Sequence, residues 1–305
     1  MIKEIKNGEI TWINIINPNK EAVRFLKTRY QIAPNILRDF IPAIKRSRVE
    51  DYGSYLFAVI HFPVFNPETR KTNSTELDII VFQNTLITSH CNLFPELKRL
   101  FEKCEKDIAV KDYYMQRDAV CTLYLILDKL IDTRLPMLDH IDDHIDGIES
   151  KMFTGDERKL LQEIAYVKHD IIGFRKSIKP QRSVLESLAR ATPKISPRDY
   201  QREITEVIGS NIKVWNTLEN HKEMIEALEQ TNESIFSHRL NDTMKILTAF
   251  SVMVLPLTLI ASIFGMNTTV GMPFMQAEYG FEMILLIMVC VSLFSFFFFK
   301  FKRWL

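Results

Sequence analysis

The chain has 305 residues, 47% of them hydrophobic, and its 39 Lys and Arg residues nearly balance 38 Asp and Glu residues. A formal net charge of +1 argues against a nucleic-acid-binding protein, because such proteins normally carry a basic excess. The four cysteines have no paired spacing, which argues against a disulfide framework or a zinc knuckle.

Residues 1–108 are predicted to form an α/β domain, and no glycine-rich phosphate loop occurs in them. Helical spacing predicts helices over Glu21–Arg29 and Pro34–Ala43, since proline suits the first turn of a helix. Runs rich in β-branched and aromatic residues predict strands, which lie at Thr11–Ile15, Tyr55–Phe65, Leu77–Phe82 and Thr85–His90.

Residues 109–243 are predicted to be a helical stalk. The segment Thr192–Pro197 interrupts the helical pattern, and neither proline nor glycine occurs between Ser210 and Leu255. These features predict a single helix over Tyr200–Phe264, on the order of 95 Å long at ~1.5 Å per residue. A helix of this length must pack against a neighbour or against copies of itself.

Two apolar runs near the C-terminus predict membrane-spanning helices at residues 244–264 and 282–300. The run Ile246–Phe264 has no charged residue and suffices to cross a hydrocarbon layer of ~30 Å. The loop at 265–281 lacks Lys and Arg, whereas Lys245 precedes the first span and Lys300 begins a basic tail at 301–305. The positive-inside rule therefore predicts that both termini are cytoplasmic. The alternative is a pair of buried core helices.

A polar stripe runs along the end of the long helix at alternating steps of three and four residues. This 3.5-residue repeat is typical of a supercoiled seam. Hydroxyl groups dominate it, and they can serve either close helix packing or the lining of a pore, two interpretations that the spacing leaves open. The stripe consists of Asn241, Met244, Thr248, Ser251, Leu255, Thr258, Ser262 and Gly265.

The tripeptide Gly265-Met266-Asn267 stands between the two spans, and the chain ends in Lys-Arg-Trp-Leu. With Thr11–Ile15, Pro34–Asp39 and the segment from Asn241 to Leu247, these residues make the chain resemble the CorA family of magnesium transporters over nearly its whole length. The family is also known as the two-transmembrane Gly-Met-Asn family of metal ion transporters.

The resemblance implies an α+β membrane protein that assembles as a homopentameric funnel in the cell inner or plasma membrane. It implies a passive channel for Mg²⁺, and also for Co²⁺, driven by the membrane potential, with no organic cofactor, no nucleic-acid partner and no enzymatic activity. It makes Gly265, Met266 and Asn267 the selectivity filter, and it favours the pore interpretation of the stripe. The family assigns to the pore Asn241, Met244, Leu247, Leu255 and Thr258.

Two departures concern the ends of the ion path. Relatives place an acid in the external loop after the filter, whereas Met272-Pro273 is followed here by Phe274. Two interpretations remain open: Glu278 or Glu282 substitutes in attracting cations, or ion capture is weaker in this chain. The resemblance also implies gating by cytosolic Mg²⁺ bound between subunits. The acids that it implicates are Asp39, Asp128 and either Glu203 or Glu206, and Arg38 replaces an acid of the relatives.

An acidic helix face is predicted from Asp139, Asp142, Asp143 and Asp146 at i, i+3, i+4 and i+7. His140 and His144 lie four residues apart beside it, a spacing that can also chelate zinc. The remaining alternatives for the whole protein are a zinc transporter on the same fold and a membrane-anchored scaffold that conducts nothing.

Overall fold

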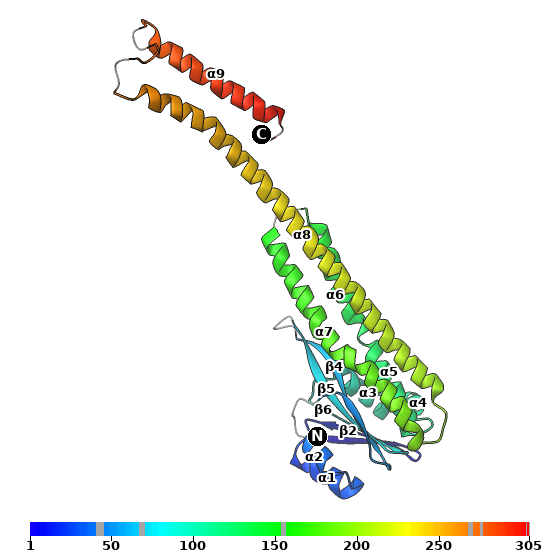
Figure 1. The fold of residues 1–305 in the computed structure, drawn as a ribbon. Helices are drawn as coiled ribbons and strands as arrows, with labels where there is room; N and C mark the ends of the chain where they lie inside the picture. The colour runs from blue at the N-terminus through cyan, green and yellow to red at the C-terminus, as the bar shows by residue number, and fades with distance from the viewer. Residues whose placement is uncertain are drawn as a thin grey trace. The chain divides into compact units, whose positions relative to one another are not determined.

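The computed structural model describes residues 1–40, 46–66, 71–153, 157–267, 271–274, 277–302 and 304. The chain divides into two compact units, Met1–Glu229 and Gln230–Leu305. Each unit is described by itself, and helix α8 (Gln201–Phe264) runs through both of them (Figure 1).

The first unit contains a six-stranded mixed sheet with the strand order β1-β2-β6-β5-β4-β3. Only β2 and β6 are parallel, and every other neighbouring pair is antiparallel. The strands are β1 (Ile2–Asn7), β2 (Ile10–Ile16), β3 (Arg48–Asp51), β4 (Leu56–Asn66), β5 (Lys71–Val81) and β6 (Thr85–His90).

One face of the sheet is covered by α1 (Lys20–Tyr30) and α2 (Pro34–Asp39). Alternate residues of the strands, among them Phe57 and Val59 of β4, pack with Leu26 and Ile36 of these helices in one buried apolar cluster. Burial of such side chains supplies the main stabilisation of this layer. Asn19 caps α1 by accepting a hydrogen bond from the backbone of Ala22.

Helices α5 (Ala119–Asp132) and α7 (Glu157–Ala191) contact strands of the same sheet, α5 at β2, β5 and β6 and α7 at β3, β4 and β5. At Gly173 the backbone of α7 approaches the carbonyl group of Thr72 so closely that an added Cβ would collide with it. The remaining helices of the unit are α3 (Pro95–Lys106), α4 (Ile108–Tyr114), α6 (Leu135–Lys151) and the short η1 (Thr192–Lys194).

The predicted strands at β2, β4 and β6 are confirmed, and the predicted long helix matches α8 to within one residue at its start. The prediction for β5 was too short, because the strand begins at Lys71 and not at Leu77. Its polar first half pairs with β4 over its whole length, from Lys71 opposite Asn66 onward. The predicted helix Pro34–Ala43 was too long, because α2 ends at Asp39 and Phe40 is not helical. Residues 41–45 lie outside the described residues.

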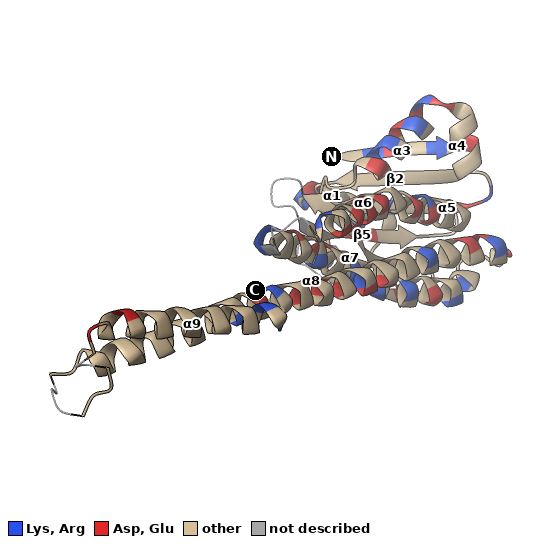
Figure 2. Ribbon diagram, turned by 90° about the horizontal axis from the view of Figure 1, so that it is seen from above, with Lys and Arg blue, Asp and Glu red and all other residues tan. Residues whose placement is uncertain are grey.

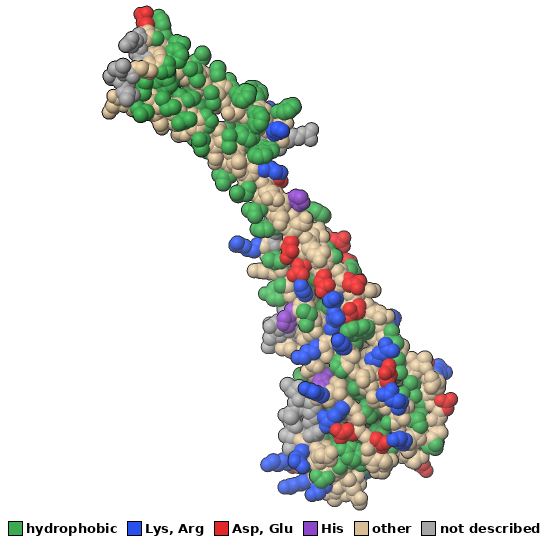
Figure 3. Space-filling model, in the orientation of Figure 1, with side chains coloured by type: hydrophobic (Ala, Val, Ile, Leu, Met, Phe, Trp, Pro, Cys, Tyr) green, Lys and Arg blue, Asp and Glu red, His purple; other side chains and the backbone are tan. Residues whose placement is uncertain are grey.

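The second unit contains the end of α8 and helix α9 (Gly280–Phe301). Both helices are long and apolar enough to cross a membrane. In the most apolar stretch of each helix, only 6% of the residues are buried within the chain. This exposure contradicts the alternative that the two helices are buried core helices of a soluble protein. Figure 3 shows hydrophobic side chains over the visible surface of this unit, whereas charged side chains gather on the first.

His90 in β6 is 3% exposed, and burial lowers its pKa to about 4. In the unfolded chain an ordinary histidine pKa is near 6.5, so between these values the unfolded state binds the extra proton. We expect the stability to fall by up to about 3 kcal/mol as the pH falls from about 6.5 to 4. Thermal unfolding at several pH values should show this loss reduced in His90→Leu. An equal loss in that variant, or the same reduction in the exposed-site control His140→Leu, would contradict the assignment.

Candidate ion-conduction site

The predicted stripe lies on α8, and all of its side chains are exposed in the single chain. Among the apolar members, Met244 is 52% and Leu255 67% exposed, and Leu247 beside the stripe is 57% exposed. Residues that alternate at three and four positions share one side of a helix. The helix therefore presents a continuous stripe that no part of the described chain covers. Its members on α8 are Asn241, Met244, Thr248, Ser251, Leu255, Thr258 and Ser262.

Three hydroxyl groups of the stripe donate their hydrogen bonds to the backbone of their own helix. Each of these hydroxyls donates to a backbone carbonyl four residues earlier, so that its oxygen lone pairs remain as acceptors. The waters bound to a cation donate hydrogen bonds outward, so such oxygens suit a hydrated cation. The contacts run from Thr248 to Met244 at 2.7 Å, from Ser251 to Leu247 at 2.9 Å and from Thr258 to Val254 at 3.0 Å.

Pro256 lies inside α8, and the helix continues through it. Proline has no N–H group, so the carbonyl of Val252 has no helical donor at this turn. The Thr258 hydroxyl also contacts the Leu255 carbonyl at 2.9 Å, immediately before the proline. The backbone hydrogen bonding of α8 is therefore weakened next to Leu255, the more exposed of the two apolar members of the stripe.

The Gly-Met-Asn tripeptide directly follows the end of α8 at Phe264. Gly265 does not adopt the left-handed conformation that would explain a glycine at a helix end. Its backbone N–H instead donates to the Ala261 carbonyl at 2.9 Å, and an added Cβ would stand 3.0 Å from that same oxygen. Close approach and not φ is thus the reason for glycine here. The side chains of Met266 and Asn267 are exposed.

Both candidate external acids are exposed, and Glu282 lies in the first turn of α9. A carboxylate is favourable there because the amino-terminal end of a helix carries partial positive charge. Lys300 lies in the last turn of the same helix. Figure 2 shows acidic side chains near the start of α9 and basic ones near its end. Helix α9 therefore carries its basic residue at the end that the positive-inside rule places in the cytoplasm.

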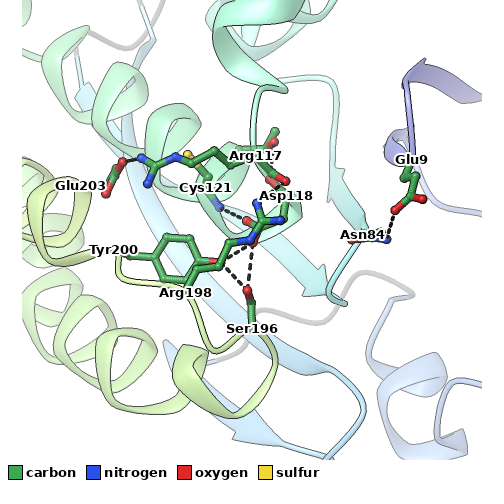
Figure 4. Close-up of polar contacts among 10 residues, drawn as sticks. Glu9, Asn84, Arg117, Asp118, Cys121, Ser196, Arg198, Tyr200 and Glu203 are labelled. Carbon is green, nitrogen blue, oxygen red and sulfur yellow. Dashed lines mark hydrogen bonds and ion pairs between the residues drawn. The ribbon is translucent and has the colours of Figure 1, made fainter.

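The two candidate regulatory acids at the start of α8 have different surroundings. Glu203 is 7% exposed and forms an ion pair with Arg117, which precedes α5 (Figure 4). Glu206 is exposed, and within the described residues its carboxylate pairs with Arg202 on the same helix, at 3.0 Å. An exposed carboxylate is free to exchange its partner for an ion, whereas a buried ion pair is costly to break.

Asp128 on α5 lies close to this region and accepts a hydrogen bond from the Ser210 hydroxyl at 2.8 Å. Burial raises its pKa, and the charges of Asp132 and Glu206 raise it further. The charges of Asp132 and Glu206 thus make the potential at Asp128 negative, a divalent cation would relieve this potential, and Mg²⁺ prefers oxygen ligands. Within the described residues, however, no group of three His, Cys, Asp or Glu side chains has metal-binding geometry.

Asp39 is the last residue of α2, and its side chain lies outside the described residues. The predicted acidic face is present on α6, where the aspartates at 139, 142, 143 and 146 are all exposed. Asp142 contacts the buried His221 of α8 at 3.2 Å. The face is therefore solvated at three of its four acids and engaged with α8 at the fourth.

A buried carboxylate that the sequence analysis missed lies beside Glu203. Asp118 is 2% exposed and caps α5 by accepting the Cys121 N–H at 2.9 Å. Its other oxygen accepts hydrogen bonds from the hydroxyls of Ser196, at 2.9 Å, and Tyr200 (Figure 4). This contact raises the pKa of Tyr200, although burial contributes more. An aspartate directly before an apolar run is a capping signal, but nothing local indicates its partners 78 and 82 residues later.

Comparison with known proteins gives consistent matches over almost the whole chain. A family model described as "CorA-like Mg2+ transporter protein" matches residues 7–303. The cobalt/magnesium transport protein CorA of Thermotoga maritima is 27% identical over 298 residues, covering 97% of this chain and 83% of that protein. The putative metal ion transporter YfjQ of Bacillus subtilis is 24% identical over 305 residues, covering 99% of this chain and 93% of that protein.

The complete structure of the CorA magnesium transporter from Methanocaldococcus jannaschii shares the fold, with a TM-score of 0.84. Sequence identity in that comparison is 20%, and the alignment covers 99% of this chain and 93% of that one. Such similarity extends through both units, including the two apolar helices.

Proposed function

The chain belongs to the family of CorA-like Mg²⁺ transporters, and from this premise we propose that it is a channel for Mg²⁺ and Co²⁺ in the inner or plasma membrane. Membership confirms the predicted family and the prediction that the chain is a transporter and not an enzyme. The carrying observation is the exposed stripe of α8, in which the hydroxyl protons of Thr248, Ser251 and Thr258 are already donated to the backbone.

The stripe lines the pore of a homopentamer in this proposal. Mg²⁺ sheds its water reluctantly, so a wall of hydrogen-bond acceptors without fixed charge suits the hydrated ion. The carbonyl of Gly265 and the amide oxygen of Asn267, repeated around the axis, form the external filter. Met244 and Leu255 form apolar rings that can close the pore by dewetting. A scaffold without conduction has no use for such a stripe across the membrane.

The driving force is the membrane potential. With both termini cytoplasmic, an inside-negative potential draws each elementary charge inward with about 2.3 kcal/mol per 100 mV. Glu278 and Glu282 at the external end attract cations to the filter. The proposed parts of the chain keep the predicted boundaries, with residues 1–108 and 109–243 cytosolic and the spans at 244–264 and 282–300.

The direct test is ion flux into liposomes that contain the purified full chain. Mg²⁺ and Co²⁺ should enter, and an inside-negative potential should accelerate their entry. Flux of Zn²⁺ with exclusion of Mg²⁺ would instead support the zinc-transporter alternative. Absence of flux for all three ions in correctly assembled protein would support a scaffold.

Regulation by cytosolic Mg²⁺ is the finer part of the proposal, and the surroundings of the two acids favour Glu206 over Glu203 as the ligand. We expect Glu206→Gln to raise the internal Mg²⁺ concentration that halves the flux by roughly threefold or more. Asp39→Asn should act in the same direction. The measurement is flux against internal Mg²⁺ in liposomes.

The matched control is Glu203→Gln, which deprives Arg117 of its buried partner. This change should lower the thermal unfolding midpoint and leave the inhibitory Mg²⁺ concentration unchanged. The reverse pattern, with inhibition lost only in Glu203→Gln, would assign the site to Glu203.

A further inference from the structure

Helix α8 contacts the first unit through a buried seam. After its first turn the buried positions recur at alternating steps of four and three residues, which is again a heptad spacing. The polar stripe from Asn241 to Ser262, called the conduction stripe below, follows the same heptad repeat but is offset from the seam by two residues. No heptad position therefore belongs to both the seam and the stripe. The seam consists of Val207, Asn211, Val214, Leu218, His221 and Ile225.

One polar member of the seam is joined to both neighbouring layers. Asn211 is 1% exposed, and its amide Nδ2 donates to Gln181 Oε1 of α7 at 2.8 Å. Gln181, also 1% exposed, donates from Nε2 to the backbone carbonyl of His61 in β4 at 2.6 Å. Two hydrogen bonds thus connect β4, α7 and α8 in series through the interior of the first unit.

The other polar member of the seam, His221, is less completely bonded. It contacts Asp142 through Nε2, but within the described structure its Nδ1 has no hydrogen-bond partner. The Asn211–Gln181 hydrogen bond is therefore the polar contact that fixes how α8 packs along the seam.

A displacement of α8 along or about its axis changes which residue faces Gln181. Moving the helix by one turn brings Val207 or Val214 opposite Gln181, so that Gln181 Oε1 loses its donor and the buried amide of Asn211 loses its acceptor. An apolar seam would tolerate such a shift far better, since valine and leucine at the same positions are interchangeable contacts. A single buried asparagine is known to specify register in paired helices for this reason.

We propose that Asn211 and Gln181 are positioning residues, which set the axial and rotational register of α8 and thereby aim its conduction stripe. The inference rests on the proposed channel function for its consequence, but the register itself is a property of the first unit. Neither residue touches the ion path.

The test compares the double variant Asn211→Leu/Gln181→Leu with the exchanged pair Asn211→Gln/Gln181→Asn. Replacing both partners of a buried hydrogen bond with apolar groups can be nearly neutral, and here only the His61 carbonyl also loses its donor. The leucine pair should therefore lower the thermal unfolding midpoint only slightly while Mg²⁺ flux falls by roughly fivefold or more. The exchanged pair, which restores an amide-to-amide contact of the same total length, should recover most of that flux.

Asn220→Leu, an exposed amide on the same helix, is the matched control and should leave flux unchanged. Wild-type flux in the leucine pair, or a loss that follows a lower unfolding midpoint and is not recovered by the exchanged pair, would overturn the proposal.

A second measurement separates this inference from the proposed function. Spin labels at the exposed positions Lys176 on α7 and Lys213 on α8, in a chain whose native cysteines are replaced, report the register directly. The distance distribution should broaden or shift in the leucine pair and return in the exchanged pair, whether or not the protein conducts Mg²⁺. An unchanged distribution in the leucine pair would refute the positioning role even in a chain that transports the ion.

Discussion

Replacing Asn267 with alanine is expected to abolish Mg²⁺ flux into liposomes while the assembled protein persists. In the proposed filter the amide oxygens of several subunits accept hydrogen bonds from the waters around the ion. Alanine removes every one of these amide acceptors at once and leaves only the Gly265 carbonyls of the proposed filter. The exposed position of Asn267 after the end of α8 means that the change strands no buried group.

The control for this experiment is Asn220→Ala, an equivalent loss of an exposed amide on α8. Its flux should equal that of the unmodified protein, and chemical crosslinking should show the same oligomer in both variants. Normal flux in Asn267→Ala would exclude the filter assignment. Loss of the oligomer would place the residue in assembly and not in selectivity.

Replacing Asp118 with alanine is expected to cause the largest loss of stability, about 2–4 kcal/mol. The change removes the cap of α5 and leaves the buried hydroxyls of Ser196 and Tyr200 without their acceptor. Because these hydroxyls belong to the connection that leads into α8, the start of that helix should loosen first. Thermal unfolding and hydrogen exchange over the first turns of α8 measure both effects.

Two milder variants separate the contributions at Asp118. Asp118→Asn retains a capping oxygen and should cost less than the alanine variant, while Tyr200→Phe removes one hydrogen bond and should cost about 1 kcal/mol. Equal stability of Asp118→Ala and the unmodified protein would show that the buried carboxylate does not hold the start of α8.

The long helix and the two apolar spans were predictable because their determinants are local. A stretch without proline or glycine, followed by a run without charge, indicates a helix that enters a membrane whatever lies around it. The edge strands β1 and β3 and the first half of β5 were missed for the converse reason. Their residues are polar, as in Asn73-Ser74-Thr75, and they are held as strands by pairing with neighbours distant in the sequence.

The candidate sites divide in the same way. The stripe from Asn241 to Ser262 follows from helical periodicity alone, and so does the acidic face of α6. The choice between Glu203 and Glu206 does not, because it depends on Arg117, which the fold brings to Glu203 from the segment that precedes α5. For the same reason the partners of Asp118, Gln181 and Asn211 could not be predicted, since a hydrogen bond between distant residues leaves no local pattern.

The two spans and the face of α8 that the ion is proposed to meet could be predicted from residue order alone, because they depend on spacings of three or four residues and on uninterrupted apolarity, whereas the class of protein followed from the resemblance of motifs to a known family. The acid that is buried beside Arg117, the anchor at the first turn of α8 and the amide pair proposed to set its register became visible only in the folded chain. Those properties depend on distances between elements, and the packing of helices and sheet fixes these distances.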